Sequence, residues 1–253
     1  MMKTNLKSRA CVFASVAIVG FSLTACDVSD LERLLDGDDP GFSSPSTPVD
    51  VNQEGDYFEI TGTAERNYEA NADEVKYCDL DELERAVCAY GELTFKTRED
   101  AQKRGRQPLN VDPAAWPDNK EVDIPALDDV EGSKDYHGWF YNRSHMLGDS
   151  LGGDPIKENL VTGTRPQNVG SVKNSGGMAY TETIARDYLD SEKSKDCPLY
   201  YAAAPQYEGD EMLPRTVTVD IQTCDKEIDE HVVVDNTANG WSIDYSDGSF
   251  TKD

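Results

Sequence analysis

The sequence predicts an α+β domain with a central, mostly antiparallel sheet, flanking helices and long loops. Strand-like runs rich in β-branched and aromatic residues occur at residues 57–61, 199–203, 216–222 and 232–234. A helix is expected to carry Glu182 and Arg186, which are four residues apart and therefore share a helix face. Residues 98–135 are rich in charge and proline, so we expect long loops there around a short helix or none.

The first 25 residues have the pattern of a bacterial signal peptide. Three basic residues precede an apolar run at residues 11–21, which is too short to span a membrane. The Leu-Thr-Ala-Cys ending resembles a lipobox, so we expect cleavage before Cys26 and attachment of lipid to its thiol. The alternative is an ordinary secretory signal with a coincidental cysteine. Residues 26–55 are expected to form a flexible acidic, Pro- and Ser-rich linker, and residues 56–253 a single, monomeric domain.

Four cysteines remain for the exported domain, namely Cys78, Cys88, Cys197 and Cys224. They predict two disulfides with three possible connectivities, of which we favour Cys78 with Cys88 and Cys197 with Cys224. A helix over residues 79–89 would hold its ends about 15 Å apart, whereas disulfide Cα atoms lie about 4.4 to 6.8 Å apart. The first pair therefore predicts a short turn, followed by a strand near residues 88–95. The absence of a Cys-x-x-Cys pair argues against a zinc site.

A cluster of polar groups is collected between Trp139 and Arg186. An aromatic, strand-like run ends with Arg143 and His145, and a Gly-rich turn at residues 148–153 lets the chain reverse into a second short strand at residues 160–164. The cluster holds one imidazole, two carboxamides, one carboxylate and two guanidinium groups: His145, Asn159, Asn168, Glu182, Arg143 and Arg186.

These groups suit phosphodiester hydrolysis with a hard metal ion. The reaction needs a base for water, positive charge on the phosphoryl oxygens and help for the leaving alkoxide. His145 can be the base, because an ordinary histidine pKa of about 6.5 leaves the ring mostly neutral at pH 7. Mg²⁺ prefers oxygen ligands such as an Asn carbonyl and retained waters. We read His137 and His231 as structural.

Residues 141–148 (YNRSHMLG), followed by residues 158–165 (ENLVTGTR) and Asn168, resemble the DNA/RNA non-specific endonucleases. These are the ββα-metal nucleases, and the similarity is greatest to the branch of streptococcal secreted and DNA-entry nucleases. The family pattern is Asp-Arg-Gly-His, then Asn-Leu-x-x-x-Thr, a metal-binding Asn, and a helix with Glu and Arg one turn apart. The resemblance covers most of residues 57–245 and implies the ββα-metal nuclease fold.

The resemblance also implies roles for individual residues. It implies that His145 is the general base and that Asn168 is a direct ligand of Mg²⁺, for which Mn²⁺ can substitute. Asn159 would support the site, and Glu182 would hold a water on the metal or orient its surroundings. Arg186 and Arg143 would neutralise the phosphate. Asn142 and Ser144 depart from the Asp and Gly of the family pattern. If the Asp orients the histidine through its backbone, Asn142 is harmless; if its charge matters, His145 is a weaker base. We favour the first.

The spacing of Asn168 and Glu182 predicts a bend in the chain. They are 14 residues apart, which on one straight helix would be roughly 21 Å, too far for one metal site. Gly170, Gly176 and Gly177 supply the break. Pro166 suits a helix start, so Asn168 is expected both to begin a helix and to bind metal.

The acidic composition argues against a nucleic-acid substrate. The formal net charge is −25, and polyanion binding ordinarily depends on Lys and Arg. Residues 139–190, however, hold five basic and six acidic residues and are nearly neutral. Arg104 and Arg106 read first as solvated surface charge, with substrate contact as the alternative. We therefore expect a lipid-anchored, extracytoplasmic, Mg²⁺-dependent endonuclease acting on DNA and RNA; the alternative is a non-catalytic surface lipoprotein that binds a ligand or partner.

Overall fold

The computed structural model describes residues 53–172 and 175–253. The expected signal peptide, the lipidation residue Cys26 and the linker up to residue 52 lie outside the described residues. Within the described ranges, no helix has the length and apolar character needed to cross a membrane.

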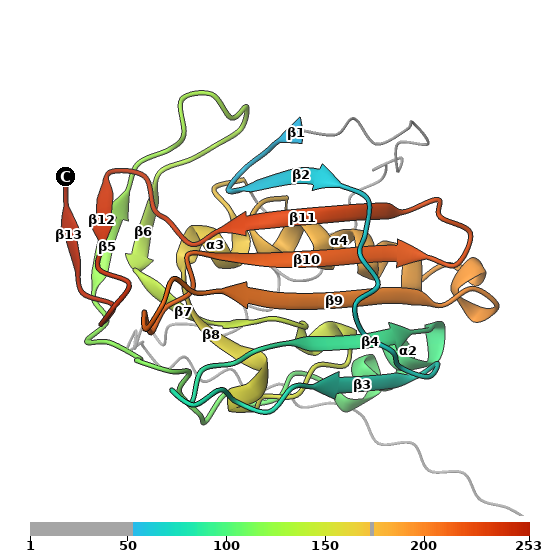
Figure 1. Cartoon of the computed structure of the whole chain (residues 1–253). Helices are drawn as coiled ribbons and strands as arrows, with labels where there is room; N and C mark the ends of the chain where they lie inside the picture. The colour runs from blue at the N-terminus through green and yellow to red at the C-terminus, as the bar shows by residue number, and fades with distance from the viewer. Residues whose placement is uncertain (1–52, 173–174) are drawn as a thin grey trace, which may run out of the picture. The chain divides into compact units, whose positions relative to one another are not determined.

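A seven-stranded sheet forms the centre of the domain (Figure 1). Its strands follow the order β1-β2-β11-β10-β9-β4-β3, and each neighbouring pair is antiparallel. The strands are β1 Gln53–Glu54, β2 Phe58–Gly62, β3 Glu74–Tyr77, β4 Ala89–Leu93, β9 Leu199–Gln206, β10 Thr216–Thr223 and β11 Asp229–Asp235. The four strand-like runs predicted from the sequence lie in β2, β9, β10 and β11. Strand β1 falls at the end of the segment expected to be linker.

Three two-stranded sheets and three α-helices complete the described fold. The pairs are β5 Glu121–Ile124 with β6 Tyr136–Trp139, β7 Tyr141–His145 with β8 Leu160–Thr164, and β12 Trp241–Ile243 with β13 Phe250–Lys252. The helices are α2 Phe95–Arg104, α3 Arg165–Val169 and α4 Met178–Leu189. Short 3-10 turns occur at Asp149–Leu151, Lys157–Asn159 and Glu192–Lys195.

Helix α2 is the short helix that was allowed for residues 98–135, whereas strand β5 lies in a stretch of that segment expected to be loop. The helix has ten residues and starts before that segment, at Phe95. Its start is set by a capping box in which the Thr94 side chain accepts from the backbone of Thr97, and the Thr97 hydroxyl accepts from the backbone of Thr94. Threonine stands at the third helical position, where Glu or Gln is usual in a capping box.

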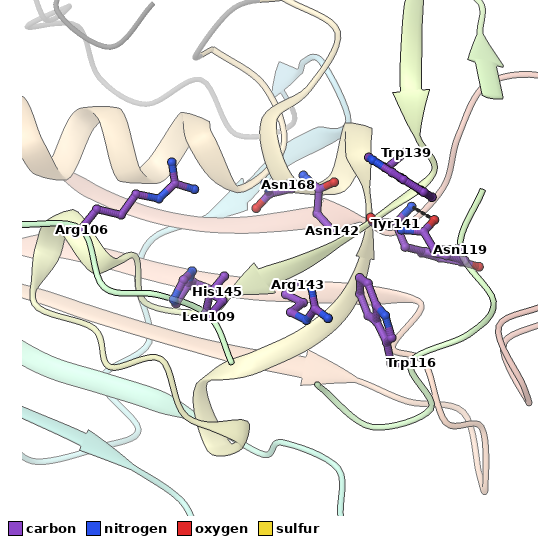
Figure 2. Close-up of a pocket in the computed structure, with 10 residues that line it drawn as sticks. All are labelled: Arg106, Leu109, Trp116, Asn119, Trp139, Tyr141, Asn142, Arg143, His145 and Asn168. Atoms are coloured by element: carbon purple, nitrogen blue, oxygen red, sulfur yellow. Dashed lines mark hydrogen bonds between the residues drawn. The ribbon is translucent and has the colours of Figure 1, made fainter. Parts of the chain in front are cut away.

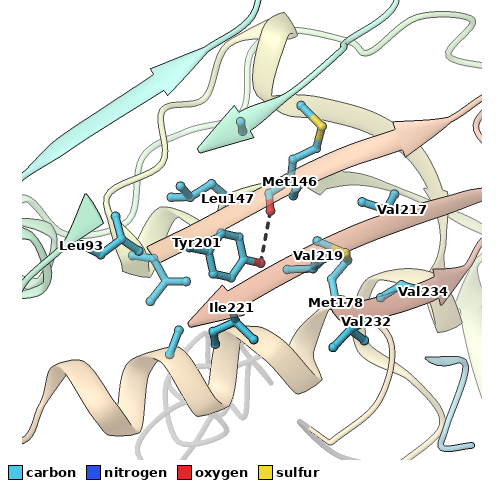
Figure 3. Packing of buried hydrophobic residues seen from close by; sticks show 14 of the residues in the cluster. Leu93, Met146, Leu147, Met178, Tyr201, Val217, Val219, Ile221, Val232 and Val234 are labelled. Atoms are coloured by element: carbon cyan, nitrogen blue, oxygen red, sulfur yellow. Dashed lines mark hydrogen bonds between the residues drawn. The ribbon is translucent and has the colours of Figure 1, made fainter. Parts of the chain in front are cut away.

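The main core lies between the sheet and α4 (Figure 3). Val217, Val219 and Ile221 occupy alternate positions of β10 and are fully buried, as the period of a strand requires. Tyr201 in the neighbouring strand donates a hydrogen bond to the backbone oxygen of Met146 at 3.3 Å. The end of β7 is thereby fixed to the centre of the sheet.

Two disulfides close loops at the edges of the domain. Cys78 and Cys88 are bonded with Cα atoms 5.1 Å apart, and Cys197 and Cys224 with Cα atoms 5.3 Å apart. These are the pairs favoured from the sequence. The residues between the first pair form a turn rather than a helix, and strand β4 follows, as that pairing requires.

The carboxylate of Asp56 fills the bend between α3 and α4. It accepts hydrogen bonds at 2.6 Å from the backbone N–H groups of Ser171 and Val172 and from the Ser171 hydroxyl. A Cβ atom on Gly170 or Gly176 would lie 2.2 or 2.1 Å from an Asp56 carboxylate oxygen, so both positions need glycine. The bend expected between Asn168 and Glu182 is thus built around a buried acidic side chain.

Replacing Asp56 with alanine is expected to lower the free energy of unfolding by about 3 kcal/mol, because charge-assisted hydrogen bonds are lost and buried donors are left without an acceptor. Urea unfolding followed by circular dichroism measures the change. Asp128, which is exposed, provides the matched control, and its alanine variant should stay within about 0.5 kcal/mol of wild type. Equal stability of the two variants would show that the Asp56 contacts do not hold the bend.

Candidate active site

Strands β7 and β8 place the histidine and its neighbours. In their antiparallel register His145 pairs with Leu160 and Arg143 with Thr162. Arg143 and His145 are two residues apart and therefore point to the same face, while Ser144 points to the other face and is fully buried. Helix α3 follows β8 directly and returns Asn168 to β7, where the Ser144 hydroxyl donates to Asn168 Oδ1 at 3.1 Å.

A cleft of about 470 Å³ opens over these residues (Figure 2). It is lined by Arg106, Leu109, Trp116, Asn119, Trp139, Tyr141, Asn142, Arg143, His145 and Asn168. Three of the residues predicted for the site, His145, Arg143 and Asn168, therefore share one cavity. Its described lining holds two guanidinium groups and no Asp or Glu, although the chain as a whole is strongly acidic.

The imidazole of His145 is half-buried in the cleft wall. Burial lowers its pKa below the ordinary value of 6.5; the nearby carboxylate of Asp149 opposes this shift, and Arg106 and Arg104 add to it. Its Nε2 atom is buried and has no hydrogen-bond partner among the described residues. The ring is therefore neutral at pH 7 and has a nitrogen that no described protein group occupies.

The lowered pKa predicts the pH dependence of a reaction that uses this ring as a base. A base must be unprotonated, and a depressed pKa keeps it unprotonated to lower pH. With Mg²⁺ saturating at every pH, the acidic limb of the kcat/KM profile for DNA cleavage is expected to have its midpoint below pH 6.5. A midpoint at or above pH 6.5 would contradict the assignment of His145 as a base in a desolvated setting.

Asn168 lies near the end of its helix rather than at the beginning. Helix α3 starts at Arg165, capped by the Thr164 hydroxyl, which accepts from the backbone N–H of Gln167. The expected helix start is correct for Pro166 but wrong for Asn168, because the threonine supplies the cap. The bond from Ser144 fixes the carboxamide with its oxygen toward β7.

Glu182 reaches the turn that follows β7. A Cβ atom on Gly148 would lie 2.6 Å from Glu182 Oε1, so glycine is required for the carboxylate to approach this backbone. Burial raises the Glu182 pKa to about 7, with Arg186 opposing the shift and Asp149 adding to it. The Glu182 side chain therefore packs helix α4 against the turn after His145. Its raised pKa is a common feature of side chains in functional sites.

Three of the predicted residues, Glu182, Asn159 and Arg186, do not line the cleft. Asn159 is fully buried, where its Oδ1 accepts from the backbone of Leu147 and its Nδ2 donates to the backbone oxygens of Leu147 and Asp154. It holds the turn after β7 and supports the site without facing it. Arg186 donates to the Thr183 hydroxyl at 2.8 Å on α4 and lies near Glu182.

The loop after α2 completes the cleft. Asp112 forms an ion pair with Arg143 at 2.5 Å, and the Arg143 guanidinium lies over the Trp116 ring, 4.5 Å from its centre. The guanidinium of Arg106 is exposed and directed into the same space (Figure 2). Arg106 is exposed, as expected of a surface charge, and it also lines the cleft. Arg104, which is not in the cleft lining, pairs with Asp149.

The sequence profile of the DNA/RNA non-specific endonucleases matches residues 66–224. The chain belongs to this family. A deoxyribonuclease of Streptococcus dysgalactiae subsp. equisimilis is 34% identical over an alignment of 212 residues, and the match covers 74% of this chain and 63% of the relative. The chain therefore spans less than two thirds of that protein.

Solved structures of the non-specific endonucleases have the same architecture. The structure of Sda1 nuclease with bound zinc ion superposes with a TM-score of 0.69 at 27% identity, covering 78% of this chain and 97% of that one. NucA from Streptococcus agalactiae with magnesium ion bound has a TM-score of 0.59 at 20% identity, covering 80% and 89%, which shows a shared fold. The predicted ββα-metal nuclease fold and its streptococcal nuclease-like branch are thereby confirmed.

The residues of the cleft fit a hard, largely hydrated cation. In the described ranges no three His, Cys, Asp or Glu side chains converge as a metal-binding group. A site with one carboxamide oxygen, from Asn168, and with waters and phosphate oxygens as the other ligands, matches the preference of Mg²⁺. The His145 ring lines the same cleft, and its buried Nε2 atom has no hydrogen-bond partner among the described residues.

Proposed function

We propose that this protein is a metal-dependent, sugar-non-specific endonuclease that hydrolyses phosphodiester bonds in DNA and RNA. One observation carries the proposal: His145, Asn168 and the guanidinium groups of Arg106 and Arg143 line a single cleft that has no carboxylate in its described lining. A base, an oxygen ligand for a hard cation and two cations for a phosphate are the parts that the reaction needs.

Each residue has a distinct part in the proposed reaction. His145 removes a proton from the attacking water, while Arg143 and Arg106 bind the non-bridging phosphate oxygens. Asn168 holds Mg²⁺, with Mn²⁺ as a substitute, and a bound ion would supply positive charge to the phosphate and the leaving alkoxide. Glu182 orients the surroundings of the ion from the other side of the turn, and Arg186 balances its charge. Asn159 keeps the turn in place.

The distribution of charge makes the acidic chain compatible with a polyanionic substrate. Asn142 lines the cleft at the position where the family pattern has Asp, so this chain has a neutral amide there. Asp112, an acidic side chain beside the cleft, is paired with Arg143. Repulsion from the remaining surface would weaken affinity in a salt-dependent way without blocking the site.

We also propose that the protein acts outside the cytoplasm as a monomer attached to a membrane by lipid on Cys26. The lipobox-like ending of the signal peptide and two disulfides support this location, because disulfides persist in oxidising compartments. Fractionation of cells that express wild-type or Cys26→Ala protein tests the anchor. Wild type in the membrane fraction and the variant in the soluble fraction are expected; equal partitioning would refute the anchor.

The activity is tested with plasmid DNA, linear double-stranded DNA, single-stranded DNA and RNA, each incubated with purified protein in Mg²⁺ or in EDTA. Internal cleavage of all four in Mg²⁺ and of none in EDTA is the expected result. Absence of metal-dependent cleavage would favour a non-catalytic surface lipoprotein, and cleavage of DNA alone would restrict the substrate class.

A further inference from the structure

Trp139 stands at the end of β6 with its ring in the cleft and 54% of the residue exposed (Figure 2). The other exposed large apolar residues in the described ranges, Leu83 and Val87, are each 37% exposed and do not line the cleft. An exposed indole is not unusual alone; its place among the groups proposed to bind phosphate makes it informative.

The ring of Trp139 differs from the other aromatic rings of the cleft in having a free face. The Arg143 guanidinium covers Trp116, and Tyr141 is buried with its ring edge-on to Phe140 at 4.7 Å. Among the described residues, no aromatic ring or cation stacks on Trp139. A flat, accessible π surface is therefore available beside the phosphate-binding side chains.

The backbone of Trp139 is fixed, so the ring is presented from a rigid base. Trp139 pairs with Glu121 in the β5–β6 hairpin, its backbone oxygen accepts from the Tyr136 hydroxyl at 3.3 Å, and the next residue, Phe140, donates its N–H to the backbone oxygen of Lys120 at 2.9 Å. A platform held in this way loses little conformational entropy when a ligand stacks on it.

The charges around the cleft indicate which part of a nucleic acid would meet the ring. Glu121, opposite Trp139 in the hairpin, is acidic and disfavours a phosphate at that position. Arg106 and Arg143 attract the phosphate within the cleft. A nucleotide bound in this direction puts its neutral base toward the indole, and stacking on an aromatic ring is open to any base.

We propose that Trp139 is a base-stacking platform that binds an unpaired nucleobase next to the scissile phosphate. The inference rests on the proposed function, because it takes the substrate to be a nucleic acid. The cleft would then prefer nucleic acids whose bases can unstack from their neighbours, namely single strands, frayed ends and locally opened duplex. Trp139 would thus set the substrate preference without choosing a sequence.

Binding can be measured without cleavage in the His145→Ala protein. Fluorescence anisotropy of a labelled oligothymidylate in Mg²⁺ gives the Kd of this background and of three further variants made in it. Trp139→Ala is expected to weaken binding about 10-fold and Trp139→Phe less than about 3-fold, since alanine substitution of a stacking aromatic costs about 1–3 kcal/mol per base. Leu83→Ala, which removes an exposed apolar side chain outside the cleft, should bind like the background protein.

A strand of the same length built of abasic tetrahydrofuran nucleotides separates base stacking from general loss of affinity. It should bind equally to the background protein and to the Trp139→Ala variant, because it has phosphates but no bases. Equal oligothymidylate binding by Trp139→Ala and its background, or the same loss on the abasic strand, would overturn the proposal. If the wild-type protein cleaves no nucleic acid but binding still depends on Trp139 and on bases, the stacking site is upheld and the proposed enzymatic function is refuted. If the wild type cleaves nucleic acid but binding does not depend on Trp139, the enzymatic function is upheld and the stacking site is refuted.

Discussion

Replacement of His145 with alanine is expected to lower kcat/KM for DNA cleavage at least about 100-fold, because general-base catalysis contributes about 10²- to 10⁴-fold. The ring lines the cleft, its pKa is lowered, and its Nε2 atom has no partner among the described residues. The loss should appear in kcat, since the imidazole acts on the attacking water. Initial rates on a fluorescent double-stranded substrate in saturating Mg²⁺ measure it.

His137 provides the matched control for this prediction. Its side chain is 71% exposed and its Nδ1 atom lies 2.7 Å from Asp123, outside the cleft lining. His137→Ala is expected to retain activity within about 2-fold of wild type, as for other exposed positions remote from the chemistry. Wild-type rates from His145→Ala, or equal losses from both variants, would remove the imidazole from the mechanism.

Replacement of Asn168 with alanine is expected to abolish most of the Mg²⁺-dependent cleavage rate and the Mg²⁺-induced increase in Tm. The side-chain oxygen is the direct ligand that we propose for the ion, and a metal contributes several kcal/mol of transition-state stabilisation, so a loss of about 100-fold or more in rate is expected. Thermal unfolding gives a readout independent of turnover: Mg²⁺ should raise the Tm of wild type and leave that of Asn168→Ala unchanged.

Two companion variants sharpen the assignment of Asn168. Ser144→Gly restores the residue of the family pattern and removes the donor to Asn168 Oδ1, so it should weaken the Mg²⁺-induced Tm shift less than Asn168→Ala does. Asn67→Ala alters an exposed carboxamide that does not line the cleft and should leave the shift intact. An undiminished Tm shift in Asn168→Ala would assign the metal to other residues.

The sequence was informative wherever a local pattern decided the structure. Alternation in residues 216–222 predicted β10, because strand period and burial agree there. The Gly-rich turn after His145 predicted the reversal into β8, and the structure adds that Gly148 is small in order to admit Glu182. The spacing of Cys78 and Cys88 correctly required a turn, since a helix would have separated them.

The features that the sequence left open depend on contacts between distant segments. Arg106 read as surface charge because the cleft wall to which it belongs forms only when the loop after α2 folds toward β7. Asp56, 115 residues before Ser171, gave no local sign that it would fill the bend after α3. Asn159 belongs to the same sequence motif as the proposed catalytic residues, but it is completely buried and therefore supports the turn instead of facing the cleft. Sequence spacing alone cannot distinguish a buried supporting residue from one that faces the cleft.

In the proposed mechanism, a neutral imidazole and a carboxamide-bound cation meet over one phosphate-binding cleft. A crystal structure of the protein grown with Mg²⁺ and a non-cleavable phosphorothioate dinucleotide tests it most directly. We expect Mg²⁺ at about 2.1 Å from Asn168 Oδ1 and also bound to a phosphate oxygen, with a ring nitrogen of His145 facing the phosphorus from the opposite side. Mg²⁺ and phosphate bound outside the cleft, or a His145 ring turned away from the phosphate, would contradict it.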